Sequence, residues 1–179
     1  MIKYLICSID EIAENDYKRY FHLMPPERQK KCLSYARDCD KKLCVAAYIL
    51  LCRLSDRYEI KFTYGKNGKP EEENNQFFFS LSHSGQFAAA VLSDQPVGID
   101  IEVIRPVSKS VINRVCTKNE LATVYDGSDV SFYKIWTFKE AYFKKEGTGL
   151  SAGLKNVDIS DYCDMLLCKV TERFVLTII

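Results

Sequence analysis

The sequence lacks the cysteine and histidine spacings that are typical of a soft-metal site. It contains eight cysteines but no C-x-x-C pair, and only two histidines. This spacing lacks the common zinc and redox motifs. We therefore predict reduced thiols that fill the core of a cytoplasmic protein, at Cys7, Cys32, Cys39, Cys44, Cys52, Cys116, Cys163 and Cys168.

The sequence also lacks an excess of charge of one sign and long apolar runs. Lysine and arginine number 25 against 24 acidic residues, so no overall field favours nucleic acid as the main partner. No apolar run approaches the length of a membrane span, and the first residues lack the apolar core of a signal peptide. We expect a monomer with neither a nucleic-acid nor a membrane partner, in which any anion site is local.

The apolar pattern predicts an α+β fold with two pseudo-symmetric lobes, because helices followed by strands occur twice. We expect residues 1–105 and 106–179 to form the lobes, each a long helix against a small antiparallel sheet. The first half reads as a strand at 2–9, a helical stretch at 27–58 with a break near 37 and 38, and a meander of strands at 77–82, 86–93 and 97–103. The second half reads as helices at 108–115, 119–125 and 132–145, then strands at 157–160, 165–171 and 174–179.

An acidic strand is the first of two segments that carry chemistry. Ile99 and Ile101 alternate with Asp100 and Glu102, so a strand here buries the isoleucines and points both carboxylates to the other face, roughly 7 Å apart at Cα. The alternative is the solvated face of an edge strand.

The second segment is the helix predicted at 132–145, in which Trp136, Glu140 and Lys144 recur at a spacing of four and share one face. Oxygen ligands converging with an ammonium suggest Mg²⁺ and a phosphate-bearing substrate. The alternative is that Lys139, Glu140, Lys144 and Lys145 only solvate the outer face of the helix.

Three further features have structural alternatives. Glu120 fits a capping box with Thr117, and this role can coexist with a role at the site. Ser82 and His83 at a strand end can hydrogen-bond a phosphate or nucleotide, whereas a Ser/His hydrolase lacks its nucleophile elbow. Lys69 stands between glycine and proline, where it can reach an anion or simply complete a turn. The basic helix face at 28–42 is interpreted as solvated.

Together these segments resemble the 4′-phosphopantetheinyl transferases, specifically the larger, two-lobed Sfp-like type. That family's motifs read V/I-G-x-D-V/I and, further on, F/W-S/C/T-x-K-E-S/A-x-x-K. The chain meets every defined position of both motifs, and the resemblance extends in order over about residues 25 to 152. The defined positions are Val97, Gly98, Asp100 and Ile101, then Trp136, Thr137, Lys139, Glu140, Ala141 and Lys144.

The resemblance implies transfer of the 4′-phosphopantetheine arm of coenzyme A to a serine of an apo acyl, peptidyl or aryl carrier protein, with release of 3′,5′-ADP. It implies that Mg²⁺ is held by Asp100, Glu102 and Glu140, and that the catalytic residues are Glu140, Lys144 and Asp100. Glu140, directly or through a water, is the favoured base for the carrier serine, although which carboxylate takes the proton stays open.

The resemblance also assigns coenzyme A contacts. Lys144 would contact its phosphates or arm, and Lys31, Lys69, Ser82 and His83 match positions that bind its nucleotide and phosphates. The family's arginine for the 3′-phosphate falls near Lys41 or Lys42, of which we assign Lys42; a lysine supplies charge without a bidentate fork. Two other functions are considered: a non-catalytic coenzyme A or carrier-protein binding module, and a Mg²⁺ phosphohydrolase.

Overall fold

The computed structural model describes residues 1–65, 67–125, 128–150, 153–162 and 167–179. Residues 151 and 152, which end the stretch of family resemblance, lie outside these ranges, as do Cys163 and the start of the strand predicted at 165–171. The fold is α+β with small antiparallel sheets, as predicted.

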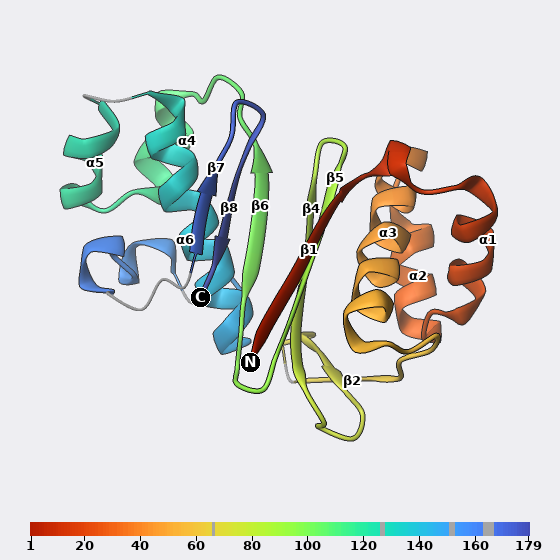
Figure 1. The fold of residues 1–179 in the computed structure, drawn as a ribbon. Helices are drawn as coiled ribbons and strands as arrows, with labels where there is room; N and C mark the ends of the chain where they lie inside the picture. The colour runs from red at the N-terminus through yellow and green to blue at the C-terminus, as the bar shows by residue number, and fades with distance from the viewer. Residues whose placement is uncertain (66, 126–127, 151–152, 163–166) are drawn as a thin grey trace.

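The N-terminal sheet has the strand order β1 (Ile2–Ser8), β5 (Phe87–Ser93), β4 (Phe78–Ser84), and all its pairs are antiparallel. Three helices cover its outer face: α1 (Glu14–Leu23), α2 (Pro26–Ser34) and α3 (Asp38–Ser55) (Figure 1). The break predicted near residues 37 and 38 is confirmed, since α2 ends at Ser34 and α3 begins at Asp38. Helix α1 was not predicted.

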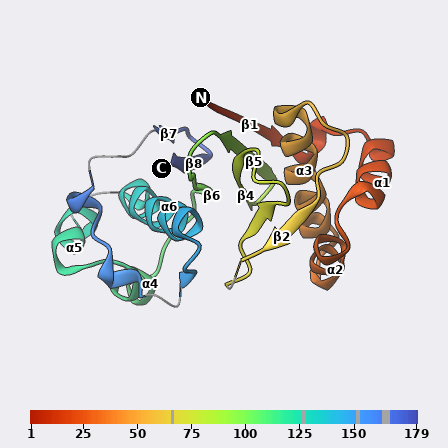
Figure 2. The ribbon, with the colours of Figure 1, turned by 90° about the horizontal axis from the view of Figure 1, so that it is seen from below.

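Helix α3 is the centre of the N-terminal core. An apolar stripe of Leu43, Ala47, Leu50 and Leu54 predicts one buried face, yet every residue from Leu43 to Cys52 is buried. The reason is tertiary, because α1 and α2 enclose the side of α3 that the sheet does not cover. Figure 2 shows α3 between the sheet and the other two helices. The small residues Ala46 and Ala47 of α3 are fully buried and allow close packing there.

The C-terminal sheet has the order β6 (Ile99–Val103), β8 (Phe174–Ile178), β7 (Leu167–Val170). Helix α6 (Asp129–Glu146) packs on it, and α4 (Lys109–Val115) and α5 (Lys118–Tyr125) lie beyond α6 (Figure 2). The strand predicted at 157–160 is wrong, because 3₁₀ turns η3 (Leu154–Asn156) and η4 (Ile159–Asp161) occupy this part of the chain.

The predicted meander is also wrong, since β6 pairs antiparallel with β8 rather than with β5. The alternation of isoleucines and acidic residues shows only that Ile99 and Ile101 share a face of the strand, not which strand pairs with it. That face packs against Ala89 and Val91 of β5, so the two sheets meet through side chains instead of extending one another.

Strands β4 and β6 nevertheless lie side by side at the centre of the molecule (Figure 1). Two serine hydroxyls of β4 link their edges: Ser82 Oγ accepts from the Ile101 N–H at 3.4 Å, and Ser84 Oγ accepts from the Val103 N–H at 3.2 Å. Ser82 and Ser84, two residues apart on β4, therefore bind the amides of two residues that are also two apart on β6.

Glycine is required where β6 approaches α6. A Cβ on Gly98 would lie 1.9 Å from the carbonyl oxygen of Ala141, far inside van der Waals contact. This approach brings the acidic face of β6 against the helix.

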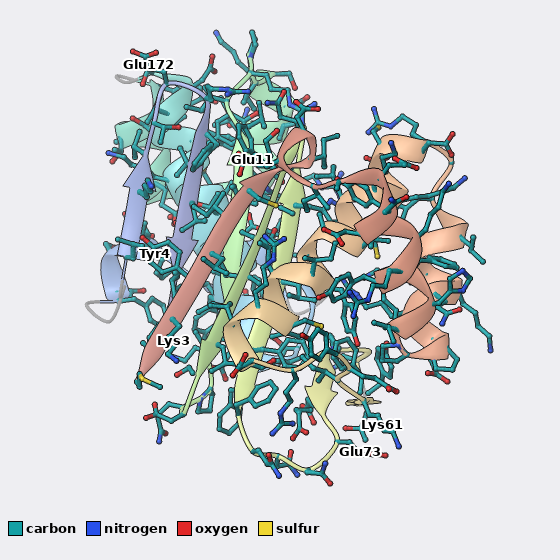
Figure 3. All side chains as sticks on the ribbon, turned by 45° about the vertical axis from the view of Figure 1, so that its right-hand side comes forward. Lys3, Tyr4, Glu11, Lys61, Glu73 and Glu172 are labelled. Atoms are coloured by element: carbon teal, nitrogen blue, oxygen red, sulfur yellow. The ribbon has the colours of Figure 1, made fainter. Side chains whose placement is uncertain are left out.

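A small antiparallel hairpin of β2 (Phe62–Tyr64) and β3 (Pro70–Glu72) lies in the N-terminal half of the chain and contacts the C-terminal half. Lys61 and Glu73 mark its base in Figure 3, at the end of the molecule opposite Glu172. Lys69 Nζ donates to the Lys145 carbonyl at 2.7 Å, and Asn67 Nδ2 donates to the Gly147 carbonyl at 2.9 Å. The hairpin is thus attached to the C-terminal end of α6.

The seven cysteines in the described ranges are free thiols, and five of them are buried. The core-filling prediction is confirmed for Cys7, Cys32, Cys44, Cys52 and Cys116, whereas Cys39 is exposed. Among the helices of the described residues, none combines the length and the apolar character needed to cross a bilayer.

Candidate active site

Asp100 lies at the centre of the candidate site, only 3% exposed. Its Oδ1 accepts from Ser82 Oγ at 2.7 Å and from Lys144 Nζ at 2.6 Å. Its Oδ2 is buried and has no hydrogen-bond partner among the described residues. Because a buried carboxylate oxygen is normally satisfied, this atom points to a missing ligand.

Glu102 lies two residues further along the same face of β6 and is held at both oxygens. Ser84 Oγ donates to Oε2 at 2.5 Å, and Trp136 Nε1 donates to Oε1 at 3.3 Å. Burial, then the charge of Asp100, raises the pKa of Glu102.

Glu140 projects from α6 one turn before Lys144 and lines the same cavity as Asp100 and Glu102. Burial raises the pKa of Glu140 from 4.5 to about 7; Lys144 opposes this shift, and the other two carboxylates add to it. A carboxylate with such a pKa can accept a proton near neutral pH.

The carboxylate cavity, as we call it, measures about 230 Å³. It is lined on one side by the three carboxylates and Lys144, and on the other by residues of α2, α3 and β4 that include Arg28, Lys31, Tyr35, Cys44, Ser82 and His83. An adjoining cavity of about 230 Å³ shares Arg28, Lys31, Glu140 and Lys144 and extends to Lys69. Cations and carboxylates thus face one another across a continuous space.

Arg28 is a site residue that sequence reasoning missed, because its helix face was interpreted as solvated. The side chain is only 6% exposed. Its Nη2 donates to the Cys44 carbonyl at 3.0 Å, while its buried Nε has no partner among the described residues. The available signal was its spacing of three from Lys31, which places both on one face of α2.

His83 lies beside Tyr35, whose Oη is 3.5 Å from its Nε2. Burial, followed by the charges of Arg28 and Lys144, lowers the pKa of His83 to about 4. The imidazole is therefore neutral near pH 7 and offers one donor and one acceptor.

Lys42 is not brought to either cavity. Its Nζ donates to Glu14 at 3.1 Å and lies over the Tyr17 ring. The physical reason is helical geometry, since Lys42 is about 200° around α3 from the cavity-lining Cys44. Lys69 reaches the adjoining cavity but donates to the Lys145 carbonyl.

Glu120 forms the predicted capping box: its Oε2 accepts from the Thr117 N–H at 2.8 Å, and Thr117 Oγ1 accepts from the Glu120 N–H at 3.3 Å. It also binds Lys139, whose Nζ lies 2.6 Å from Glu120 Oε2. The solvated alternative is therefore wrong for Lys139, which is fully buried. Neither residue lines the carboxylate cavity.

Within the part of the chain that the structure describes, no three His, Cys, Asp or Glu side chains are arranged as a metal-binding group. Asp100, Glu102 and Glu140 share a cavity without closing into a ligand set. The metal role of these residues stays a prediction.

Comparison with known proteins decides the family. The sequence pattern described as the 4′-phosphopantetheinyl transferase superfamily matches residues 96–167. The 4′-phosphopantetheinyl transferase gsp of Aneurinibacillus migulanus is 31% identical over 161 residues, which cover 84% of this chain and 68% of the relative. The chain belongs to the 4′-phosphopantetheinyl transferase superfamily.

Two other relatives support this assignment. The transferase Sfp of Bacillus subtilis strain 168 is 28% identical over 159 residues, 83% of this chain and 71% of the relative. AcpT of Salmonella typhi is 40% identical over 112 residues, 58% of this chain and 57% of the relative. The Sfp-like resemblance is confirmed, and this phosphopantetheinyl transferase is an enzyme.

Proposed function

We propose that this transferase moves the 4′-phosphopantetheine arm of coenzyme A to a serine hydroxyl of an apo acyl, peptidyl or aryl carrier protein, with Mg²⁺, and releases 3′,5′-ADP. The observation that carries the proposal is the convergence of Asp100, Glu102, Glu140 and Lys144 on one cavity, in which a buried oxygen of Asp100 has no hydrogen-bond partner among the described residues.

The donor set fits Mg²⁺. Asp100, Glu102 and Glu140 offer only oxygen, which this hard cation prefers. Burial and the charges of neighbouring carboxylates raise the pKa values of Glu102 and Glu140, and a bound cation would favour their ionised forms. Mg²⁺, when bound, would neutralise charge that develops on the pyrophosphate as its P–O bond breaks.

Glu140 and Lys144 would act on the two reactants. Glu140, directly or through a water, would accept the proton of the carrier serine. Lys144 pairs with Asp100 Oδ1 but keeps 29% of its side chain exposed, so its ammonium can also contact a phosphate in the cavity.

The cationic wall would bind the nucleotide end of coenzyme A. Arg28 and Lys31 line both cavities, with His83 on one side and Lys69 on the other. The Nε of Arg28, which has no partner in the part of the chain that the structure describes, is a buried donor suited to a phosphate oxygen. Arg28 would thus take the role that the sequence assigned to Lys42. Ser82 Oγ donates to Asp100 Oδ1 and accepts from Lys144 Nζ, so it would act on the phosphates by positioning Lys144.

The carrier protein would approach from the side of Glu102. There an open groove of about 650 Å³, here called the arginine groove, is lined by Glu102, Trp136, Arg105, Arg114 and the apolar residues Val107, Val111 and Phe132. Basic and apolar side chains suit an acidic helical partner.

We also propose that residues 1–105 and 106–179 are pseudo-symmetric lobes, with the site between them. The described residues form two three-stranded sheets, β1-β5-β4 and β6-β8-β7, and each half contributes one 18-residue helix. The lobes would exchange a strand, since β6 lies within residues 1–105 but pairs with β8.

The test is to incubate the enzyme with coenzyme A, Mg²⁺ and a panel of apo carrier proteins and to read each carrier by intact mass. We expect one carrier to gain a single phosphopantetheine arm, with 3′,5′-ADP released, and Asp100→Asn to abolish the gain. Free phosphopantetheine in solution would instead indicate a phosphohydrolase, and binding without turnover would indicate a binding module.

A further inference from the structure

Glu102 is the only one of the three cavity carboxylates for which the structure records a hydrogen bond at each oxygen among the described residues. Ser84 Oγ also accepts from the Val103 N–H at 3.2 Å. Because this bond occupies a lone pair of the hydroxyl and orients it, the single hydroxyl proton is directed to Glu102 Oε2.

The second donor comes from the helix that carries Glu140. Trp136 lies one turn before Glu140 on α6, and its ring is stacked with Phe132 at 6.4 Å between centroids and an interplanar angle of 11°. The indole is therefore fixed to α6, and its N–H sets the position of Glu102 relative to Glu140.

The hydrogen bonds from Ser84 on β4 and Trp136 on α6 together fix the plane of the Glu102 carboxylate. Each carboxylate oxygen keeps a second lone pair that can bind a cation. Donors that orient a ligand in this way commonly tune metal affinity. We propose that Ser84 and Trp136 are positioning residues that hold Glu102 in place for a divalent cation, and that the indole of Trp136 senses cation binding. This inference rests on the proposed function, which places Mg²⁺ at Glu102.

Trp136 is the only tryptophan in the sequence, so intrinsic fluorescence reports on this indole alone. The experiment titrates MgCl₂ into the enzyme at constant ionic strength and follows tryptophan emission. We expect a saturable change in the wild type and none in Glu102→Gln. Ser84→Ala should raise the half-saturating Mg²⁺ concentration by about ten- to a hundredfold, because the carboxylate loses one of its two restraints.

A matched control is Ser93→Ala, which removes another buried hydroxyl of the same sheet, bonded to the Gln95 amide. It should leave the half-saturating concentration unchanged. Trp136→Phe keeps a ring against Phe132 but removes the N–H donor. Calorimetry should show weaker Mg²⁺ binding in this variant, and transfer should recover as Mg²⁺ is raised, which a purely structural defect would not allow.

Ser84→Ala with a half-saturating concentration within twofold of the wild type, or Trp136→Phe with unchanged Mg²⁺ binding, would overturn the inference. So would a wild type that transfers the arm but shows no fluorescence response. Each of these results leaves the reaction itself intact. Failure of the proposed function would instead appear in the mass assay, as the absence of arm transfer to any carrier.

Discussion

Helix α6 carries two lysines whose ion pairs differ in character. Lys139 Nζ lies 2.6 Å from Glu120 and also donates to the carbonyls of Val115 and Leu154, and the two side chains are 0% and 1% exposed. Lys144 Nζ lies 2.6 Å from Asp100, yet its own side chain is 29% exposed and Asp100 Oδ2 has no partner in the described residues.

The difference separates a structural ion pair from a functional one. Glu120 accepts further bonds from the Thr117 and Ile159 amides, so desolvation of both charges is compensated within the fold. Asp100 is only partly compensated, and beside it Glu102 and Glu140 have raised pKa values. Incomplete satisfaction beside perturbed carboxylates is expected where a ligand completes the site.

The largest expected effect is on catalysis. Asp100→Ala and Glu140→Ala should each lower transfer by about a thousandfold or more, since several kcal/mol of metal-based stabilisation is lost. Glu102→Ala should be severe but partial. Thermal unfolding should show intact folds. Glu146→Ala, an exposed acid on the same helix, is the control for steady-state assays, and near wild-type turnover of Asp100→Ala would contradict the metal assignment.

The second prediction compares how much each of the two lysines contributes to the stability of the fold. Lys139→Met leaves Glu120 charged and buried, which should lower the free energy of unfolding by about 3–5 kcal/mol. Lys144→Met should lower it less, because Asp100 lines the cavity and keeps the hydrogen bond from Ser82. Urea unfolding measures both. The double variant Lys139→Met/Glu120→Leu should recover part of the loss because no lone buried charge remains. Equal losses for the two lysine variants would remove the distinction between the pairs.

A smaller effect is expected from the cationic wall. Arg28→Ala should raise the Michaelis constant for coenzyme A by about ten- to a hundredfold, as one or more charge-assisted bonds are lost, with little change in turnover. Lys42→Ala, on the opposite side of α3, is the matched control. The assays vary coenzyme A at saturating carrier. A larger rise in the Michaelis constant for Lys42→Ala than for Arg28→Ala would favour Lys42, the residue assigned from the sequence, over Arg28.

The smallest effect is on pH dependence without metal. The pKa of Glu140 is raised to about 7, so its contribution to stability is full below about pH 4.5 and is lost as pH rises to about 7. The pKa of His83 is lowered to about 4, so stability falls as pH drops from about 6.5 towards 4. The two contributions oppose each other, each amounting to about 1–3 kcal/mol.

Urea unfolding in EDTA between pH 4 and pH 7.5 separates them. Relative to wild type, Glu140→Gln should gain stability as pH rises through this window, and His83→Asn should lose it. If the free energy of unfolding changed with pH in the same way in all three proteins, neither Glu140 nor His83 would have the shifted pKa that its burial indicates.

Local features of this protein follow from the sequence alone. The spacing of four in Trp136, Glu140 and Lys144 places them on one helix face, and alternation places Asp100 and Glu102 on one strand face. Thr117 and Glu120 form their capping box because its contacts span only three residues. The α+β class and the helix break before Asp38 were predictable for the same reason.

Only the tertiary structure decided which of these faces meet. The alternation of apolar and acidic residues in β6 is compatible both with hydrogen-bonded pairing to β5 and with side-chain packing against β5. In the fold, β6 packs against β5 and pairs with β8. Lysines are solvated by default, so nothing local reveals that Lys139 is buried or that Lys42 faces away from the cavity. The spacing of Arg28 and Lys31 places them on one helix face, but only the fold shows that this face lines the cavity. Trp136 meets Glu102 because Gly98 lets β6 approach α6, and Ser84 meets it because β4 lies beside β6; both are contacts between residues distant in sequence.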